Sequence, residues 1–242
     1  MRGFMPEELY KHQESGFRIE DGVTDVFQGM ENRAVPLYSE IQRMVAELAG
    51  DHALENTVVY DLGCSGGNSM IGMNTTVDPG IRFIGVDESE EMLEQCKSRL
   101  LELGFSRDYE LRRVDLNKGI SISDASVVLM VLTLQFVRPI NREKLLHNIF
   151  DGLIPGGVLL LVEEILAEED DFNRDFLKYY YNFKRRNNFS DAEITRKRAA
   201  LENVLVPYRL SENIMLLKET GFSRIEVFFK WYNFAGLIAV KG

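Results

Sequence analysis

Short apolar runs and segments with helical spacing alternate along the central part of the chain. After Ser89, apolar positions recur every three or four residues until Gly104, and 141–153 repeats this pattern before the turn residues Pro155, Gly156 and Gly157. Strands that alternate with helices predict a parallel sheet with right-handed crossovers. The five predicted strands of this part are 58–63, 82–87, 109–115, 126–132 and 158–162.

The C-terminal part breaks this alternation. A helix at 211–220 ends at Gly221, and two strand patterns follow at 225–231 and 236–240. The four residues between these strands require an antiparallel pair, because a parallel crossover needs a dozen residues or more. We therefore predict a doubly wound α/β fold whose mostly parallel, seven-stranded sheet contains a reversed C-terminal strand.

The remaining segments are predicted to be helical additions to one domain that spans residues 1–242. Residues 1–55 form an N-terminal helical cover, and the polar stretch 167–206 forms a helical insert after the fifth strand. The chain has no internal repeat, and its 45% hydrophobic content is ordinary for a globular domain.

Charge and composition restrict the partners. A net charge of −10 opposes direct binding to nucleic acid or to an anionic membrane. No apolar run reaches the roughly 18 residues of a transmembrane helix, no secretory signal is recognisable, and two cysteines do not form a disulfide framework. We therefore expect a cytoplasmic protein. Its histidines, His12, His52 and His147, lack ligand-like spacing, so no metal site is expected.

A glycine-rich turn, DLGCSGG, follows the first predicted strand. Asp61 lies at the end of that strand, and Asp87 and Asp115 end the second and third strands. In an open α/β sheet the carboxyl ends of the strands form the ligand crevice, and an acidic residue after the second strand can accept both hydroxyls of a ribose. The alternative, that Asp61 and Asp87 are only turn or cap residues, does not explain why three acidic strand ends share one edge.

The same residues narrow the ligand. A phosphate-binding loop is excluded because no Lys-Ser/Thr pair follows the glycines and because the carboxylates would repel phosphate. Asp61 instead favours a ligand that carries a cation. A nucleoside with ribose hydroxyls, adenine and a positive ammonium or sulfonium group is S-adenosylmethionine, which we predict as the cofactor.

The chain resembles the carboxy-S-adenosylmethionine synthase family within the class I S-adenosylmethionine-dependent methyltransferase superfamily. The generic segments are YDLGCS at 60–65, LTLQF at 132–136 and LIPGG at 153–157; the less generic ones are VFQGMENRAVPLYSEI at 26–41, NFKRRNNFSDAEITRKRAALENV at 182–204 and YNFAGLIAVK near the end. The resemblance implies an enzyme that deprotonates the methyl group beside the sulfonium and attaches a carboxyl group derived from prephenate, leaving phenylpyruvate. It also implies a homodimer whose product supplies the modification of wobble uridine in tRNA.

The resemblance assigns roles to individual residues. Tyr38 covers the ligand, and Arg198 grips the new carboxylate with its guanidinium, so both are expected to be catalytic. At Val131 the family carries an Asn, so a side-chain hydrogen bond to the cofactor is missing at the methionine end. The cofactor-binding residues implied are Gly63, Cys64 and Ser65 along the methionine, Asp87 and Glu88 at the ribose, Asp115 and Leu116 at the adenine, and Tyr38 and Arg198 over the ligand. Asp61 and Val131 complete the predicted cofactor site.

Two other functions remain open from the sequence. A conventional methyltransferase could use the polar insert as a pocket for a small acceptor, and a non-catalytic cofactor-binding subunit could scaffold a tRNA-modifying partner. Among the other side chains, Cys64 and Cys96 are expected to serve packing. Glu163 and Glu164 follow the fifth predicted strand, which places one of them at the mouth of the site, where the sequence favours a solvated loop carboxylate over a general base. Most basic residues of 184–209 are predicted on a solvated helix face.

Overall fold

A seven-stranded sheet forms the centre of the molecule. We describe it from a computed structural model, which covers residues 31–242; the predicted cover before residue 31, and His12 with it, lie outside the described residues. The strand order is β3-β2-β1-β4-β5-β7-β6, with β7 antiparallel to both neighbours and the remaining adjacent pairs of β1 to β5 parallel. The predicted fold with its reversed C-terminal strand is confirmed. The strands are β1 Val58–Leu62, β2 Arg82–Asp87, β3 Tyr109–Arg113, β4 Ala125–Val131, β5 Leu153–Glu164, β6 Arg224–Trp231 and β7 Phe234–Val240.

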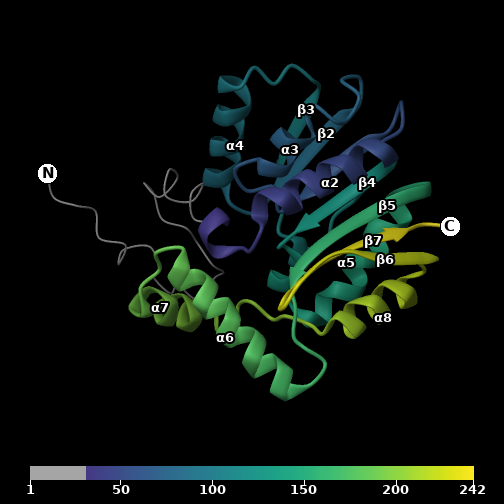
Figure 1. Ribbon diagram of the computed structural model, residues 1–242. Helices are drawn as coiled ribbons and strands as arrows, with labels where there is room; N and C mark the ends of the chain where they lie inside the picture. Colours follow the sequence, from purple (N-terminus) through teal and green to yellow (C-terminus); the bar gives the residue numbers. More distant parts are fainter. Residues whose placement is uncertain (1–30) are drawn as a thin grey trace, which may run out of the picture.

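Helices cover both faces of the sheet (Figure 1). One face is covered by α2 (Tyr38–His52), α3 (Asn68–Met73) and α4 (Glu90–Glu102), and the other by α5 (Pro139–Gly152) and α8 (Leu210–Thr220). Two 3₁₀ turns, η2 (Leu116–Lys118) and η3 (Leu134–Phe136), follow β3 and β4. None of the described helices has the length and apolarity needed to cross a bilayer.

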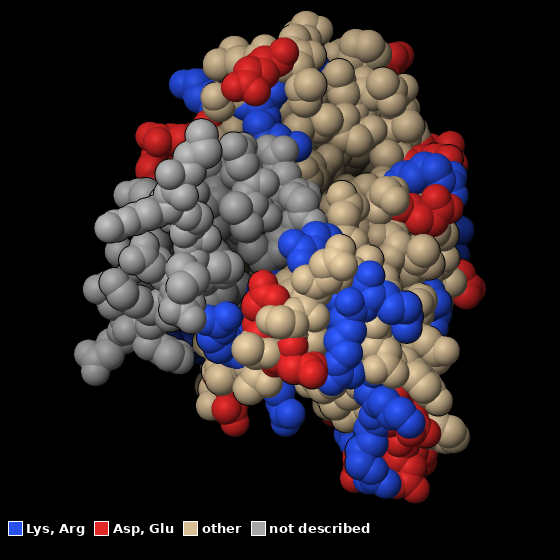
Figure 2. Space-filling view, turned by 60° about the vertical axis from the view of Figure 1, so that its left-hand side comes forward, with Lys and Arg blue, Asp and Glu red and all other residues tan. Residues whose placement is uncertain are grey.

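The predicted insert consists of two helices, α6 (Asp170–Arg186) and α7 (Asp191–Leu201), which extend from the sheet beyond the carboxyl end of β5 (Figure 1). Ser190 begins α7 through a capping box with Glu193. Basic and acidic side chains lie together on this side of the molecule (Figure 2). Most basic residues of the insert are exposed as predicted, but Lys184 is buried. Its burial corrects the prediction for that residue, because α6 packs the Lys184 side against the sheet.

Aromatic side chains attach α6 to the C-terminal hairpin. The Tyr180 ring lies 5.3 Å from that of Phe234 and 6.4 Å from that of Trp231, and Tyr180 is buried. Tyr179, the preceding residue, is instead exposed, and its ring lies 5.0 Å from that of Tyr232. Adjacent tyrosines of α6 therefore divide between the core and the surface.

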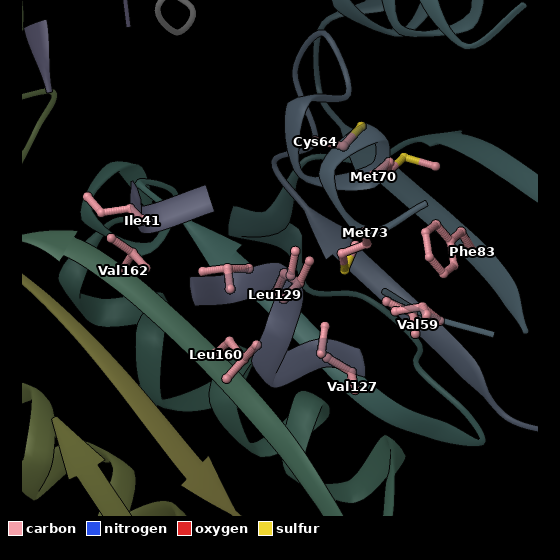
Figure 3. Packing of buried hydrophobic residues seen from close by; sticks show 14 of the residues in the cluster. Ile41, Val59, Cys64, Met70, Met73, Phe83, Val127, Leu129, Leu160 and Val162 are labelled. Atoms are coloured by element: carbon pink, nitrogen blue, oxygen red, sulfur yellow. The ribbon is translucent and has the colours of Figure 1, made fainter. Parts of the chain in front are cut away.

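Two hydrophobic clusters fill the spaces between the sheet and its helices. Val59 and Leu129 face the α2–α4 side, where Figure 3 shows the packing, whereas Tyr60 and Met130 face the α5 side. Adjacent residues of one strand thus enter opposite cores, which explains why the central strands are continuous apolar runs.

Several element boundaries differ from the predictions. β5 begins at Leu153, five residues earlier than expected, because Pro155-Gly156-Gly157 forms an irregular part of the strand rather than a turn before it. β7 begins at Phe234, two residues early. β3 ends at Arg113 instead of 115, because the Asp115 side chain accepts a hydrogen bond from the Asn117 amide and begins η2.

Candidate functional site

The loop after β1 is held tightly between β2, α4 and the turn that follows β4. The amides of Gly63 and Cys64 both donate to the Val86 carbonyl oxygen, at 2.7 and 2.9 Å. Gly63 has φ +81°, and a Cβ there would lie 2.3 Å from Oγ1 of Thr133. The loop therefore requires glycine at this position both for its backbone conformation and for the close approach of Thr133.

Asp61 is the penultimate residue of β1, directly before this loop, and is almost completely buried. Burial, together with the nearby Asp87 carboxylate, raises the pKa of Asp61 to about 7. Its Oδ2 has no hydrogen-bond partner among the described residues. A buried carboxylate with a free acceptor beside a glycine loop fits the ammonium group of an amino-acid ligand, which is the role predicted for it.

Asp87 joins the loop to the helix that follows β2. Its Oδ2 accepts from the Ser65 amide at 3.0 Å, and its Oδ1 accepts from the Ser89 amide at 2.9 Å. Burial nevertheless raises its pKa above the usual value. Each oxygen keeps a second lone pair, so the carboxylate can still accept ribose hydroxyls. Glu88 is exposed, and its backbone carbonyl accepts from Arg113.

The predicted adenine-side and methionine-side residues lie at the ends of β3 and β4. Asp115 is the N-cap of η2, and Leu116 is buried directly after it. Val131 ends β4, and its carbonyl accepts from the Thr133 hydroxyl at 3.2 Å. Leu132 has φ +59°, a conformation that is strained for a branched-side-chain residue and turns the chain sharply at this edge.

Tyr38 meets the same loop from the N-terminal side. Its hydroxyl accepts from Asn68 Nδ2 at 3.2 Å, and Asn68 also contacts the Glu31 carboxylate. Arg99 reaches from α4 to Asn68 Oδ1 at 2.9 Å and to the Gly66 carbonyl. Burial, aided by Glu31, raises the pKa of Tyr38 far above its usual value, so its hydroxyl stays protonated. A small pocket here is lined by Glu31, Ser65, Gly66, Asn68, Met92, Gln95 and Arg99.

The sequence analysis missed Glu31, Asn68 and Arg99. Asn68 carried a usable signal, because it begins the helix that follows the glycine loop. Glu31 and Arg99 carried none, since they reach Asn68 from segments 37 and 31 residues away.

No interaction among the described residues joins Arg198 to the glycine loop. Arg198 lies exposed on α7, and no hydrogen bond or ion pair joins it to another described residue. The structure thus gathers the predicted residues of β1 to β4 and of the cover at one edge, and leaves Arg198 on the insert.

Glu163 is not the loop carboxylate that the sequence predicted. It belongs to β5, is buried, and accepts from the Leu134 and Gln135 amides at 2.9 and 2.7 Å. Burial raises its pKa to about 8, against the opposing effect of these hydrogen bonds and of Arg142. Glu163 therefore fixes the turn that follows β4. Glu164 is half-buried at the strand end, where it accepts from Asn233 Nδ2 at 3.0 Å.

The two cysteines are buried, reduced neighbours. A hydrogen bond with the Cys96 side chain, reinforced by burial, raises the pKa of Cys64 well above its usual value. Cys96 Sγ also lies 2.7 Å from where a Cβ on Gly67 would be. This environment suits packing, because a nucleophilic thiol needs a lowered pKa.

Within residues 31–242 no three His, Cys, Asp or Glu side chains gather as metal ligands.

Comparison with known proteins agrees with the fold. The methyltransferase domain family model matches residues 59–157. The YcgJ protein of Bacillus subtilis superposes with a TM-score of 0.63 at 13% identity, covering 84% of this chain and 99% of that chain. Human N-acetylserotonin methyltransferase, solved with S-adenosylmethionine, gives 0.60 at 17% identity, covering 90% of this chain and 55% of its own.

The fold and the acidic strand ends around a glycine loop define a class I S-adenosylmethionine-dependent transferase. Relatives identify the family more narrowly. The carboxy-S-adenosyl-L-methionine synthase of Methylococcus capsulatus is 49% identical over 97% of this chain and 99% of the relative, and that of Desulforapulum autotrophicum is 42% identical over 93% and 91%. The chain belongs to the carboxy-S-adenosyl-L-methionine synthase family.

Proposed function

We propose that this protein converts S-adenosylmethionine and prephenate into carboxy-S-adenosylmethionine. The observation that carries the proposal on the structural side is Asp61, whose buried carboxylate offers an unpartnered oxygen beside the glycine loop. The near full-length similarity to synthases of this name supports the particular reaction.

In this proposal each strand end has one task. Asp61 binds the ammonium group, Asp87 accepts the ribose hydroxyls, and Leu116 packs on the adenine beside Asp115. Gly63, Cys64 and Ser65 bring backbone close to the methionine, and Tyr38 covers it from the opposite side. When bound, the ligand's sulfonium supplies an acidified methyl group, to which the carboxyl group is attached.

The proposal extends to Arg198, to assembly and to location. A guanidinium binds a carboxylate with two hydrogen bonds, so Arg198 would distinguish the carboxylated product from plain S-adenosylmethionine.

We expect a homodimer, for which the exposed rings of Phe172, Tyr179 and Tyr232 offer an apolar contact surface. A cytoplasmic enzyme that supplies tRNA wobble-uridine modification is consistent with the two free cysteines.

The test is to incubate purified protein with S-adenosylmethionine and prephenate and to identify the nucleoside products by mass spectrometry. A product that is heavier by one carboxyl group is expected. The Arg198→Ala variant is expected to keep its affinity for S-adenosylmethionine and to lose the carboxylated ligand. Equal loss of both ligands, or unchanged binding of both, would remove Arg198 from the proposal.

Val131 supports a second candidate, a conventional methyltransferase with a small acceptor. The apolar side chain cannot donate the hydrogen bond that an amide at this position provides. If S-adenosylmethionine stays unchanged with prephenate, and a demethylated product forms only with some other acceptor, this second function is correct. Binding without any turnover would indicate a scaffolding subunit.

A further inference from the structure

Glu31 is a carboxylate of the cover that has no task in the proposed function. It is half-buried, accepts a hydrogen bond from Asn68 Nδ2 and is hydrogen-bonded to the Tyr38 hydroxyl. Burial raises the pKa of Glu31, against the opposing effect of these two hydrogen bonds. A carboxylate drawn out of water costs free energy, so its place beside the predicted ligand tyrosine calls for a reason.

The directions of these hydrogen bonds follow from Arg99. A guanidinium only donates, so Asn68 Oδ1, which lies 2.9 Å from Arg99, is the acceptor of that pair. The Asn68 nitrogen therefore faces the cover, and its two hydrogens go to Glu31 and, at 3.2 Å, to the Tyr38 oxygen. Because Tyr38 receives a hydrogen from Asn68, its own proton goes to a different acceptor, which is the Glu31 carboxylate.

The Tyr38 hydroxyl has no hydrogen-bonding capacity left for a ligand. Gln42 Nε2 donates to it at 2.9 Å, so the amides of Asn68 and Gln42 occupy both of its lone pairs. Its proton is held by Glu31. A phenol in this state can neither donate nor accept a further hydrogen bond, so Tyr38 can serve a ligand only through its ring.

The same hydrogen bonds join three segments of the chain around the glycine loop. Arg99 of α4 also donates to the Gly66 carbonyl oxygen, and the small pocket at this point is lined by both Glu31 and Gly66. Asn68 begins α3 directly after the loop. A change at Glu31 therefore reaches Tyr38 and the loop through adjacent hydrogen bonds of one network.

On the basis of the proposed function, which places Tyr38 over the ligand, we propose that Glu31 is a positioning residue for the binding of S-adenosylmethionine. Its carboxylate holds the Tyr38 hydroxyl and the Asn68 amide together, so the tyrosine ring is fixed at the glycine loop before the ligand enters. Such preorganisation improves affinity, because the ligand does not have to order the side chain itself. Glu31 then acts on affinity through Tyr38 and takes no part in the attachment of the carboxyl group.

A double-variant cycle, with the Kd for S-adenosylmethionine measured by calorimetry, tests this assignment. Glu31→Ala should weaken binding about tenfold, which corresponds to about 1.4 kcal/mol, while kcat at saturating S-adenosylmethionine and prephenate changes less than about twofold. In the Tyr38→Phe background the same change should weaken binding less than about twofold further, because the hydroxyl that Glu31 holds is gone. Glu55→Ala, at an exposed glutamate before β1, is the matched control and should leave the Kd unchanged.

Two further variants complete the experiment. Glu31→Gln keeps an acceptor oxygen for the Tyr38 proton and should recover most of the affinity. Glu31→Met, which preserves the volume of the side chain, replaces Glu31→Ala in the cycle if the alanine variant does not fold.

Equal losses of affinity in the two backgrounds would show that Glu31 does not act through Tyr38, and the proposal is then wrong. It is also wrong if Glu31→Ala binds like the Glu55→Ala control, or if Glu31→Gln binds no better than Glu31→Ala. If the wild-type protein makes no carboxylated product, only the proposed reaction fails. The binding cycle needs no turnover and still decides the role of Glu31.

Discussion

At the scale of single residues, the main feature of the site is a pair of carboxylates at neighbouring strand ends. Burial raises the pKa of both Asp61 and Asp87, and repulsion from the Asp87 carboxylate raises the pKa of Asp61 further. The native protein therefore holds a proton on Asp61 that the unfolded chain releases at lower pH. A cationic ligand removes the reason for that proton, so ligand binding and deprotonation are linked.

The sign of this linkage gives a stability prediction. Because the pKa of Asp61 rises from 3.8 to about 7, its stabilising contribution is complete below about pH 4 and is lost as pH rises through 7. Asp61→Asn should remove this loss and stabilise the ligand-free protein at pH 8 by about 2–4 kcal/mol relative to wild type, with little gain at pH 4. Urea unfolding at the two pH values measures the difference.

Asp151→Asn, at an exposed position, is the control for that measurement and should unfold like the wild type at both pH values. Parallel stability curves for Asp61→Asn and wild type would contradict the assigned pKa. The same Asp61→Asn variant should bind S-adenosylmethionine more weakly, because the amide cannot neutralise an ammonium group.

The sequence predicted the position of a single residue correctly where that position depends on neighbours in the chain, and failed where it depends on contacts with distant segments. Asp61 and Asp87 could be placed at strand ends because apolar runs mark the strands directly before them, whereas Asp115 lies two residues beyond the end of β3. Glu163 could not be placed, because its burial depends on two amides of the turn after β4, 28 and 29 residues away. An adjacent pair of glutamates reads as a solvated loop unless those partners are known.

At the scale of elements, the glycine loop acts as a wedge between β4 and α4. A Cβ on Gly63 would clash with the Thr133 side chain, and a Cβ on Gly67, which is also in the left-handed region, would lie 2.7 Å from Cys96 Sγ. One side of the loop packs so closely against its neighbours that it has no room for side chains. The opposite side is therefore the one that can approach a ligand. This contact was invisible in the sequence, where the glycines indicate only that the turn is tight.

Substitutions at two glycines should separate this role from ordinary helix propensity. Gly63→Ala should destabilise the protein by about 2–4 kcal/mol, from left-handed strain and the clash with Thr133, and should weaken S-adenosylmethionine binding. Gly72→Ala in α3 has nothing within 4 Å of the new Cβ and should stabilise by up to about 1 kcal/mol. Urea unfolding and calorimetry measure both effects; similar values for the two variants would argue against the wedge.

At the scale of the whole molecule, the cover and the insert are tied to each other as well as to the sheet. Arg33 spans 154 and 155 positions to reach Asn187 and Asn188. The parallel direction of the first five strands and the antiparallel C-terminal pair followed from periodicity and connection length, and they were predicted correctly, whereas the order of the strands in the sheet was not predicted. The placement of α7 against the cover was not predictable, because it depends on contacts between segments that share no local pattern.

Loss of the Arg33 hydrogen bonds to Asn187 and Asn188 should increase local opening only around residues 187–189. In Arg33→Met, hydrogen exchange of the amides at 187–189 should accelerate about tenfold, while β4 and β5 keep their protection. Arg43→Met is the control, since within residues 31–242 Arg43 forms ion pairs only with Glu40 and Glu47 of its own helix, and this variant should change nothing at 187–189. Unchanged exchange in Arg33→Met would show that other contacts hold the insert.

The strand order has a consequence for biosynthesis. β7 lies between β5 and β6, yet it follows every other strand in the chain. While the nascent protein emerges from the ribosome, the apolar β5 therefore keeps an unpaired edge after β1 to β4 have been made. Such an edge is a template for aggregation, so the last few residues act as its protection. Chains truncated before residue 234 should therefore be insoluble, even though they contain every acidic residue of the predicted nucleoside site.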